Sequence, residues 1–268
     1  PVEKNELDAM NIWKIIDPNL SETELKDLSN LSLGALIEKY ILRRMKSSVL
    51  NELPGFEEKN HLIELNSKQQ RQYSEVLKKA SITKSNDALN IFGKLRQICD
   101  FDQEEKTSSK VDFIIELLDK IKLRNEKVVI FSFWIEPLLI LKERIDKSFK
   151  GNSSQLFIGD LNKSEREQSL RNFKKSDETF VLLCSGKLGG EGINLTEANH
   201  AIFFNLWWNP SNNNQARDRL LRIGQEKNVF IHTLESLNTI ESKLKYLLED
   251  KNNIYKDLID QVIKEEMN

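Results

Sequence analysis

The 268-residue chain is poor in the residues that cross-link proteins, bind metals or give a strong net charge. It has two cysteines and three histidines, and its 40 basic and 42 acidic side chains leave a net charge of −2. Cys99 and Cys184 lie in apolar segments, which is typical of reduced thiols inside cells rather than of a disulfide framework. His61, His200 and His232 are far apart in the sequence, and no Cys/His cluster has metal-ligand spacing, so we predict no zinc site.

The near-neutral charge gives no overall positive field, so charge alone neither names nor excludes a nucleic-acid partner, and any basic surface must be local. No apolar run approaches the length of a membrane span and no signal peptide is recognisable, so we expect no membrane partner. The hydrophobic fraction of 39% is enough to form a core in one large or two smaller domains. Because the chain begins with Pro1 rather than Met, we expect it to be part of a longer protein.

Residues 1–108 show helical periodicity with few glycines, and the polar stretch 102–109 ends this part. We predict a mainly helical linker or protrusion segment. Its expected elements are a short strand at His61–Leu65, a helix that Asn66 and Ser67 cap and that runs through Leu77, and a helix at Ala88–Ile98.

The pattern of apolar residues changes in residues 109–238, where apolar runs of strand length alternate with segments of helical periodicity. Strands are expected at 127–133, 155–158, 180–184, 201–205 and 229–234. Helices are expected around 113–121, at 138–149, and from a capping box formed by Ser164 and Glu167 to Phe173. Strands that are buried on both faces and separated by helices predict an α/β fold with a largely parallel sheet, whose ligands bind at the carboxyl ends of the strands. Residues 239–268 are predicted to be brace helices that pack on this lobe.

The loop Ser185–Leu195 contains four of the ten glycines of the chain. Glycines let the backbone approach a ligand and turn its N–H groups towards an anion, although such loops are often only turns. The loop is not a Walker A loop, because Leu188 follows Gly186-Lys187. At the end of the next expected strand, Trp207 and Trp208 are adjacent; Trp207 is as easily a core residue as a functional one, whereas Trp208 is favoured as a contact to a base or sugar.

The segment Gln215–Gln225 contains three arginines. If it is a helix, Gln215, Arg219 and Arg222 lie on one face, which suits phosphate because the guanidinium group is planar and always charged. The alternative interpretation is a solvated basic surface.

In their order and spacing, Ser185–Leu195, Trp208-Asn209-Pro210 and Gln215–Gln225 resemble the late motifs of the Swi/Snf family of helicase-like ATPases, which are double-stranded DNA translocases that remodel chromatin and other protein–DNA complexes. Ile41–Lys46 and Leu95–Cys99 are similar to earlier segments of the same family. The resemblance covers roughly residues 36–260. It implies a carboxyl-terminal RecA-like lobe with a helical protrusion, in an intracellular protein of the nucleus or, in a prokaryote, of the cytoplasm or nucleoid.

The resemblance also implies a nucleotide site that is completed by two arginines. Arg219 and Arg222 would be arginine fingers that reach the γ-phosphate of ATP, and Gln215 would orient the nucleotide or the fingers. The glycine loop would couple the nucleotide to DNA through Gly190, Glu191, Gly192 and Asn194. ATP and Mg²⁺ would be held mainly by an amino-terminal lobe, because the chain contains neither a Walker A loop nor an Asp-Glu box; the chain by itself is expected to be inactive.

The implied DNA track is lined by Ser132, Gly159, Ser185 and Trp208, and its contacts are expected to be with phosphates of one strand. The expected partners are double-stranded DNA, the amino-terminal lobe and, as a further candidate, a DNA-bound protein substrate.

The chain departs from the family at three places. The family usually has Gln at Phe133, an acidic residue at Asn205, and His-Pro at Phe101-Asp102, which puts the fine contacts at these positions in doubt. Two alternative functions stay open at this point, a non-catalytic DNA-binding scaffold with the same fold and a strand-separating helicase.

Overall fold

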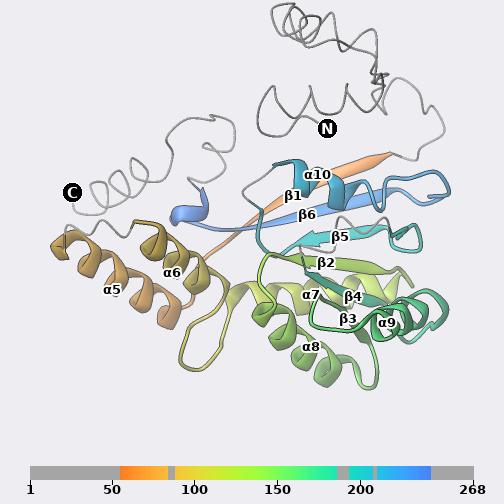
Figure 1. Cartoon of the computed structure of the whole chain (residues 1–268), viewed down its shortest axis with the longest axis horizontal. Coiled ribbons are helices and arrows are strands. Elements are labelled where there is room, and N and C mark those ends of the chain that lie inside the picture. Colours follow the sequence, from red (N-terminus) through yellow and green to blue (C-terminus); the bar gives the residue numbers. More distant parts are fainter. Residues whose placement is uncertain (1–54, 84–87, 186–192, 208–209, 243–268) are drawn as a thin grey trace, which may run out of the picture. The chain divides into compact units, whose positions relative to one another are not determined.

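The computed structural model describes residues 55–83, 88–185, 193–207 and 210–242, all of which belong to one compact unit, Leu53–Asn268. Its centre is a six-stranded parallel sheet with the strand order β1-β6-β5-β2-β4-β3 (Figure 1). The strands are β1 (Phe56–Ile63), β2 (Val128–Ser132), β3 (Ser154–Phe157), β4 (Val181–Ser185), β5 (His200–Phe203) and β6 (Val229–Ser236). The helices are α5 (Ser67–Thr83), α6 (Ala88–Asp100), α7 (Ser109–Leu123), α8 (Glu136–Phe149), α9 (Lys163–Lys175) and α10 (Pro210–Arg217).

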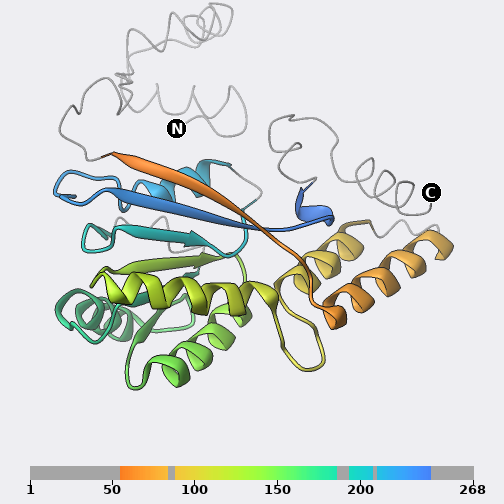
Figure 2. The same ribbon diagram turned by 180° about the vertical axis from the view of Figure 1, so that it is seen from behind.

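The sheet separates two hydrophobic cores, because successive residues of a strand point to opposite faces. Val128 and Ile130 of β2 pack in the core formed with α7 and α8, whereas Val129 and Phe131 pack in the core formed with α9 and α10. Figures 1 and 2 show α7 and α8 on one face and α10 on the other. β2 and β4 are buried along their whole length, which explains why they are continuous apolar runs in the sequence.

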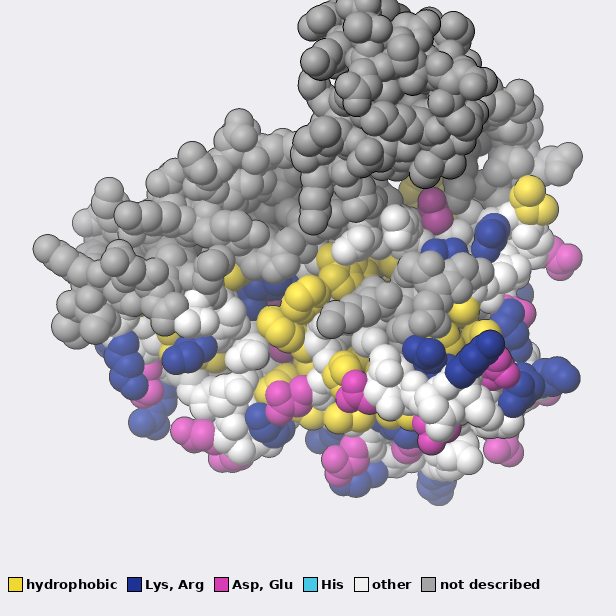
Figure 3. All heavy atoms as spheres, viewed as in Figure 1, with side chains coloured by type: hydrophobic (Ala, Val, Ile, Leu, Met, Phe, Trp, Pro, Cys, Tyr) yellow, Lys and Arg dark blue, Asp and Glu magenta, His cyan; other side chains and the backbone are white. Residues whose placement is uncertain are grey.

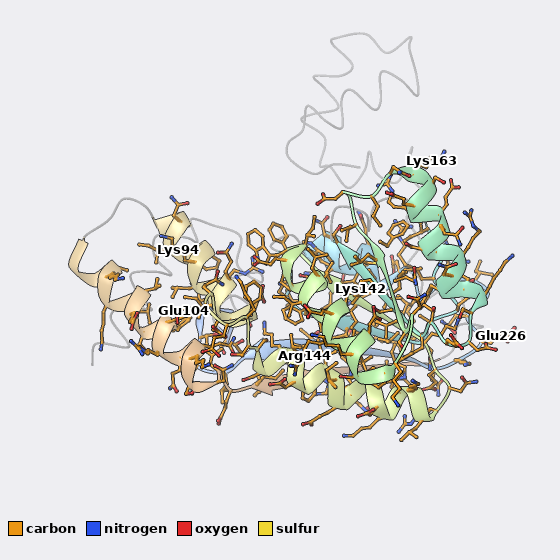
Figure 4. All side chains as sticks on the ribbon, turned by 90° about the horizontal axis from the view of Figure 1, so that it is seen from below. Lys94, Glu104, Lys142, Arg144, Lys163 and Glu226 are labelled. Atoms are coloured by element: carbon orange, nitrogen blue, oxygen red, sulfur yellow. The ribbon has the colours of Figure 1, made fainter. Side chains whose placement is uncertain are left out.

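Helices α5 and α6 form a separate pair with its own small core. Tyr73 and Leu77 of α5 pack against Phe92, Leu95 and other residues of α6. Asn66 caps the beginning of α5, as predicted, because its Oδ1 accepts hydrogen bonds from the backbone N–H groups of Lys68 and Gln69, at 3.0 and 2.9 Å. In Figure 4, Lys94 of α6 and Glu104 of the loop after it lie at the opposite end of the molecule from Lys163 of α9.

The first part of the chain contributes more strand than predicted. Strand β1 has eight residues and begins at Phe56, earlier than the expected strand at 61–65, and it pairs with β6 along its length. The alternation is hard to see because β1 is an edge strand whose side chains are mostly exposed. The division of the chain near residues 108 and 238 stays a prediction.

The capping box of α9 is formed by a different pair of residues from the one predicted. Asn162 accepts a hydrogen bond from the backbone N–H of Glu165 at 2.9 Å, and the Glu165 carboxylate accepts one from the backbone N–H of Asn162 at 2.8 Å. The predicted pair, Ser164 and Glu167, lies inside the helix. The two candidate boxes lie two residues apart, and Asn is as good a cap as Ser.

Both cysteines are buried and free, as expected, and burial raises the pKa of both thiols. Over the stretches that the structure describes, no helix is long and apolar enough to cross a membrane.

Candidate nucleotide and DNA site at the strand ends

The carboxyl ends of three neighbouring strands meet at an open pocket. Ser132 and Ser185 are paired at the ends of β2 and β4, and Gly159 lies just beyond β3. The pocket has a volume of about 700 Å³, and its lining combines aromatic and aliphatic side chains with hydroxyl, amide and backbone groups and one carboxylate; the lining residues are Phe133, Trp134, Ile135, Gly159, Asp160, Ser185, Trp207 and Asn212. Hydroxyl, amide and backbone N–H groups are common phosphate ligands in protein–DNA contacts. The structure therefore brings two of the predicted track residues, Gly159 and Ser185, to one pocket.

The turn after β2 presents an aromatic pair to this pocket. Phe133 is 39% exposed, and its ring meets that of Trp134 edge to face with the ring centres 4.6 Å apart. On the face shown in Figure 3, exposed hydrophobic side chains gather between the helical pair and the helices that cover the sheet. Ser132 itself is buried, and its Oγ accepts a hydrogen bond from the backbone N–H of Trp134 at 3.2 Å. In this structure Ser132 thus shapes the turn rather than lining the pocket.

A buried polar network lies under the same turn. Asn205, two residues after the end of β5, accepts a hydrogen bond from the backbone N–H of Phe133 at 2.7 Å and donates to the Asp100 carboxylate at 2.8 Å. Lys110 of α7 continues the network, because its Nζ lies 3.4 Å from Asp100 Oδ1 and 2.8 Å from Glu241 Oε1. The side chains of Lys110 and Asp100 are each 1% exposed. The network therefore joins α6, α7, the segments that follow β5 and β6, and the turn after β2.

The charges of this network depend on one another. Burial raises the pKa of Asp100 to about 7, against the attraction of Lys110. Burial also lowers the pKa of Lys110, but the attraction of Glu241 and Asp100 outweighs it, so the pKa of Lys110 is raised overall. Lys110 is therefore a buried cation whose charge depends on its two carboxylates.

Trp207 is a core residue. It is 3% exposed, and its ring packs edge-on against Phe131 and Phe203, with ring centres 6.1 and 5.9 Å apart. The Asn213 amide on α10 both accepts from the backbone N–H of Trp207 (3.0 Å) and donates to its carbonyl (3.1 Å). This amide fixes the beginning of α10 against the end of β5.

The segment Gln215–Gln225 is not one helix, so the prediction of three side chains on a common helical face is wrong. Helix α10 ends at Arg217, and the chain continues in tight turns to Gly224, whose φ is +99°. The reason is that other partners take the carbonyl groups that a longer helix needs. Leu195 N–H donates to the Arg219 carbonyl at 3.1 Å, and the buried Gln225 amide donates to the Leu220 carbonyl at 3.3 Å.

The three arginines have different environments. Arg217 forms an ion pair with Glu58 of β1 at 2.8 Å and lies over the ring of Phe203, so it fastens α10 to the sheet. Arg219 is half-buried, and its backbone is held to Leu195, at the end of the glycine loop. Arg222 is exposed. This arrangement leaves Arg222 as the arginine that is best placed to reach a partner outside the chain.

The remaining predicted residues fall into two groups. Gln215 and Asn194 are exposed. Gly190, Glu191, Gly192 and Trp208 lie outside the described residues, as do residues 243–268, which contain most of the predicted brace.

The three histidines of the chain, which are far apart in the sequence, form one hydrogen-bonded row on neighbouring strands. His61 Nε2 lies 3.0 Å from His232 Nδ1, and His232 Nε2 lies 3.1 Å from His200 Nδ1. The row ends at Glu126, whose Oε2 lies 2.8 Å from His200 Nε2. Their positions on β1, β6 and β5 could be foreseen only from the strand order. In the part of the chain that the structure describes, no group of His, Cys, Asp and Glu side chains is placed to hold a metal ion.

Burial lowers the pKa of all three histidines. The effect is largest at His232, where burial and then the neighbouring histidines and Lys59 lower the pKa to about 3. The row is therefore neutral near pH 7, with each ring able to donate to one neighbour and accept from the other.

A parallel sheet covered on both faces, with a pocket at the carboxyl ends of its strands and an arginine-bearing turn held to Leu195, is the architecture of a RecA-like lobe of a helicase-type ATPase. The helicase conserved C-terminal domain family matches residues 109–224, and the SNF2-related domain family matches residues 6–110. The chain belongs to the Swi/Snf family of helicase-like proteins, and it contains the carboxyl-terminal lobe.

Known proteins with related sequences and structures agree with this assignment. YwqA of Bacillus subtilis, named as a candidate ATP-dependent helicase/translocase, is 35% identical over 87% of this chain and 27% of its own length. The C-terminal part of the Fun30 ATPase domain shares the fold, with a TM-score of 0.70 at 22% identity, covering 81% of this chain and 99% of that one. The Sulfolobus solfataricus SWI2/SNF2 ATPase core in complex with double-stranded DNA has a TM-score of 0.64 and 28% identity over 97% of this chain and 61% of its own. The chain spans 27–28% of the length of three bacterial relatives and 13% of the length of a fourth relative, the DNA repair protein RAD5 of Debaryomyces hansenii.

Proposed function

We propose that this chain is the second motor lobe of an ATP-dependent double-stranded DNA translocase of the chromatin-remodelling type. In this proposal, ATP and Mg²⁺ are held mainly by an amino-terminal lobe of the same protein, and Arg219 and Arg222 complete the site. The pocket at the strand ends forms part of the track for DNA. The protein would act inside the cell, on naked DNA or on DNA that carries a bound protein.

The observation that carries the proposal is the position of the turn that bears Arg219 and Arg222. The hydrogen bond from Leu195 N–H to the Arg219 carbonyl fixes this turn beside the end of the glycine loop. The exposed side chain of Arg222 can then meet a phosphate that another lobe presents, where charge develops on the equatorial oxygens during phosphoryl transfer. The names of the relatives, which describe ATP-dependent helicases and a DNA-bound ATPase core, support this assignment.

The pocket supports the DNA part of the proposal. Gly159 is exposed, and a Cβ atom added to it would have no heavy atom within 4 Å. A glycine that the fold itself does not require is consistent with close approach of a ligand backbone. Ser185 lines the same pocket and can offer its hydroxyl and backbone groups to a phosphate.

The ATPase assignment is tested by Arg222→Ala in the protein that contains both lobes. We expect DNA-stimulated ATP hydrolysis to fall by about a thousandfold or more while ATP binding persists. Arg124→Ala is the matched control, because Arg124 is an exposed arginine between α7 and the amino end of β2, at the opposite end of the strands from the pocket. Equal turnover of the Arg222 variant and the control would show that Arg222 is not a finger, and the same result for Arg219→Ala would favour a scaffold role.

The track is tested by Gly159→Ala. Because the added methyl group has open space in the free protein, thermal stability should stay the same while the DNA concentration needed for half-maximal ATPase rises. An unchanged DNA requirement would remove Gly159 from the track. A strand-displacement assay on the parent protein separates translocation along a duplex from strand separation.

A further inference from the structure

We propose that Asn205 is a positioning residue for the DNA track. Together with Asp100 it holds the turn at 133–135 in place, so that the position of this turn depends on the position of the α5–α6 helical pair. This inference rests on the proposed function, because it names what holds one wall of the proposed track. Asn205 replaces an acidic residue of the family pattern, and Phe133 and Phe101-Asp102 are the other departures from that pattern. All of these positions lie in or next to one hydrogen-bonded cluster.

The amide of Asn205 fits its place because it needs both an acceptor and a donor. Its Oδ1 accepts from the backbone N–H of Phe133 at 2.7 Å, and its Nδ2 donates to Asp100 Oδ2 at 2.8 Å. The same Nδ2 lies 3.4 Å from Ser132 Oγ, which accepts from the backbone N–H of Trp134. One side chain therefore holds two successive backbone N–H groups of the turn, the first directly and the second through Ser132.

Asn205 follows β5, and the turn that it holds follows β2, the neighbouring strand. β2 and β5 are neighbours, but the chain leaves β2 towards β3 on one side and leaves β5 towards β6 on the other. A ligand crevice is expected at such a point, where connections diverge at the carboxyl ends of the strands. Asn205 is 1% exposed directly beneath it, and the aromatic rings of Phe133 and Trp134 form one side of the 700 Å³ pocket.

The same network reaches the helical pair. Asp100 is the last residue of α6, and Lys110 bridges it to Glu241 at the end of the described chain. Arg96 of α6 donates to the Leu206 carbonyl at 2.7 Å, and its guanidinium lies 5.8 Å from the centre of the Phe133 ring. A shift of α6 would therefore move two groups together: the Asp100 carboxylate, which accepts from Asn205, and the Arg96 guanidinium beside the Phe133 ring.

The hydrogen-bonding groups of Asn205 and Asp100 predict which substitutions release the turn and which combination holds it again. Asn205→Ala leaves the Phe133 N–H without its acceptor. Asn205→Asp keeps that acceptor but places a second carboxylate against Asp100. The exchange of both residues, Asp100→Asn with Asn205→Asp, again pairs one amide donor with one carboxylate, and the new amide oxygen at position 100 can accept from Lys110.

The experiment measures DNA-stimulated ATPase in the two-lobe protein as a function of duplex concentration, together with thermal stability. For Asn205→Ala and Asn205→Asp we expect the half-saturating DNA concentration to rise about tenfold, in line with the cost of a buried polar group that loses its partner. Turnover at saturating DNA should change much less, because the arginine turn is not altered. The double exchange should return the half-saturating concentration to within about threefold of the parent, as expected for two residues that are directly coupled.

Asn199→Ala is the matched control. Asn199 is also 1% exposed and its amide also donates to a carboxylate, that of Glu126 at 2.9 Å, but it lies at the opposite end of the same strand. It should lower stability without raising the DNA requirement.

Every result of this experiment either supports or contradicts the positioning role of Asn205. If Asn205→Ala does not fold, Asn205→Asp and the double exchange still form the test. An unchanged DNA requirement in Asn205→Asp, an equal rise in Asn199→Ala, or no recovery in the double exchange would overturn the positioning role. If the parent protein shows no DNA-stimulated ATPase at all, the proposed function itself fails, which is a different result from a normal parent with unresponsive Asn205 variants.

Discussion

The histidine row predicts a specific acid sensitivity of the sheet edge. His232 is buried between His61 and His200, and its pKa falls from the ordinary 6.5 to about 3. In the unfolded chain the same imidazole binds a proton below about pH 6.5. A histidine whose pKa is lowered by folding stabilises the folded state above its unfolded pKa, and this stability is lost as the pH falls towards the folded pKa.

The magnitude follows from the two pKa values. Each pH unit between them costs about 1.36 kcal/mol, so the full interval from 6.5 to about 3 amounts to about 5 kcal/mol, and the part between pH 6.5 and 4.5 to about 3 kcal/mol. Other groups titrate in the same range. The raised pKa of Asp100 acts in the opposite direction, because the folded state then binds a proton that the unfolded chain releases. A comparison with a variant is therefore needed to isolate His232.

The variant is His232→Gln, which keeps a donor and an acceptor between the two neighbouring rings but cannot titrate. Urea unfolding of parent and variant is measured at several pH values from 7 to 4.5. The parent should lose about 3 kcal/mol relative to the variant over this interval. Charged neighbours that face the row, namely Glu126, Arg124 and Lys59, are the same in both proteins. If the free energies of unfolding of parent and variant changed in parallel with pH, folding would not lower the pKa of His232.

Two further predictions concern elements whose partners the structure shows. Lys110→Met should lower the free energy of unfolding by about 3–5 kcal/mol near pH 7, because Asp100 and Glu241 lose the cation between them. The loss should become smaller at acidic pH, where the carboxylates are protonated, and urea unfolding measures both effects. Asn162→Ala should cost about 1 kcal/mol, because it removes the observed capping box with Glu165, whereas Ser164→Ala, at the predicted cap, should cost clearly less; thermal unfolding separates the two. Equal losses in the last pair would contradict the assignment of the cap.

The sequence predicts the sheet well where burial on both faces forces a continuous apolar run. Strands β2 and β4 lie within one residue of their expected positions for this reason. The pocket was also foreseen in part, because Gly159 and Ser185 follow or end strands whose carboxyl ends must lie at the same edge of a parallel sheet.

The sequence fails where the outcome depends on contacts between distant segments. The helix predicted at Gln215–Gln225 ends at Arg217 because Leu195 and the Gln225 amide take its carbonyl groups, and neither hydrogen bond is visible in local periodicity. The histidine row depends on the order of β1, β6 and β5. Asn205 is a departure from the family pattern in sequence, and its partner Asp100 is 105 positions away.

The pairing of β1 with β6 has a consequence for how the protein is made. Asn60 of β1 meets Glu235 of β6 across a sequence separation of 175 residues. At about 5–20 residues per second, a ribosome needs about 9–35 seconds to synthesise that distance. During this interval β1 has no sheet partner, because it pairs only with β6 in the described sheet. β1 can therefore join the sheet only after β6 has left the ribosome, and until then its unpaired backbone groups are open to mispairing and to binding by chaperones.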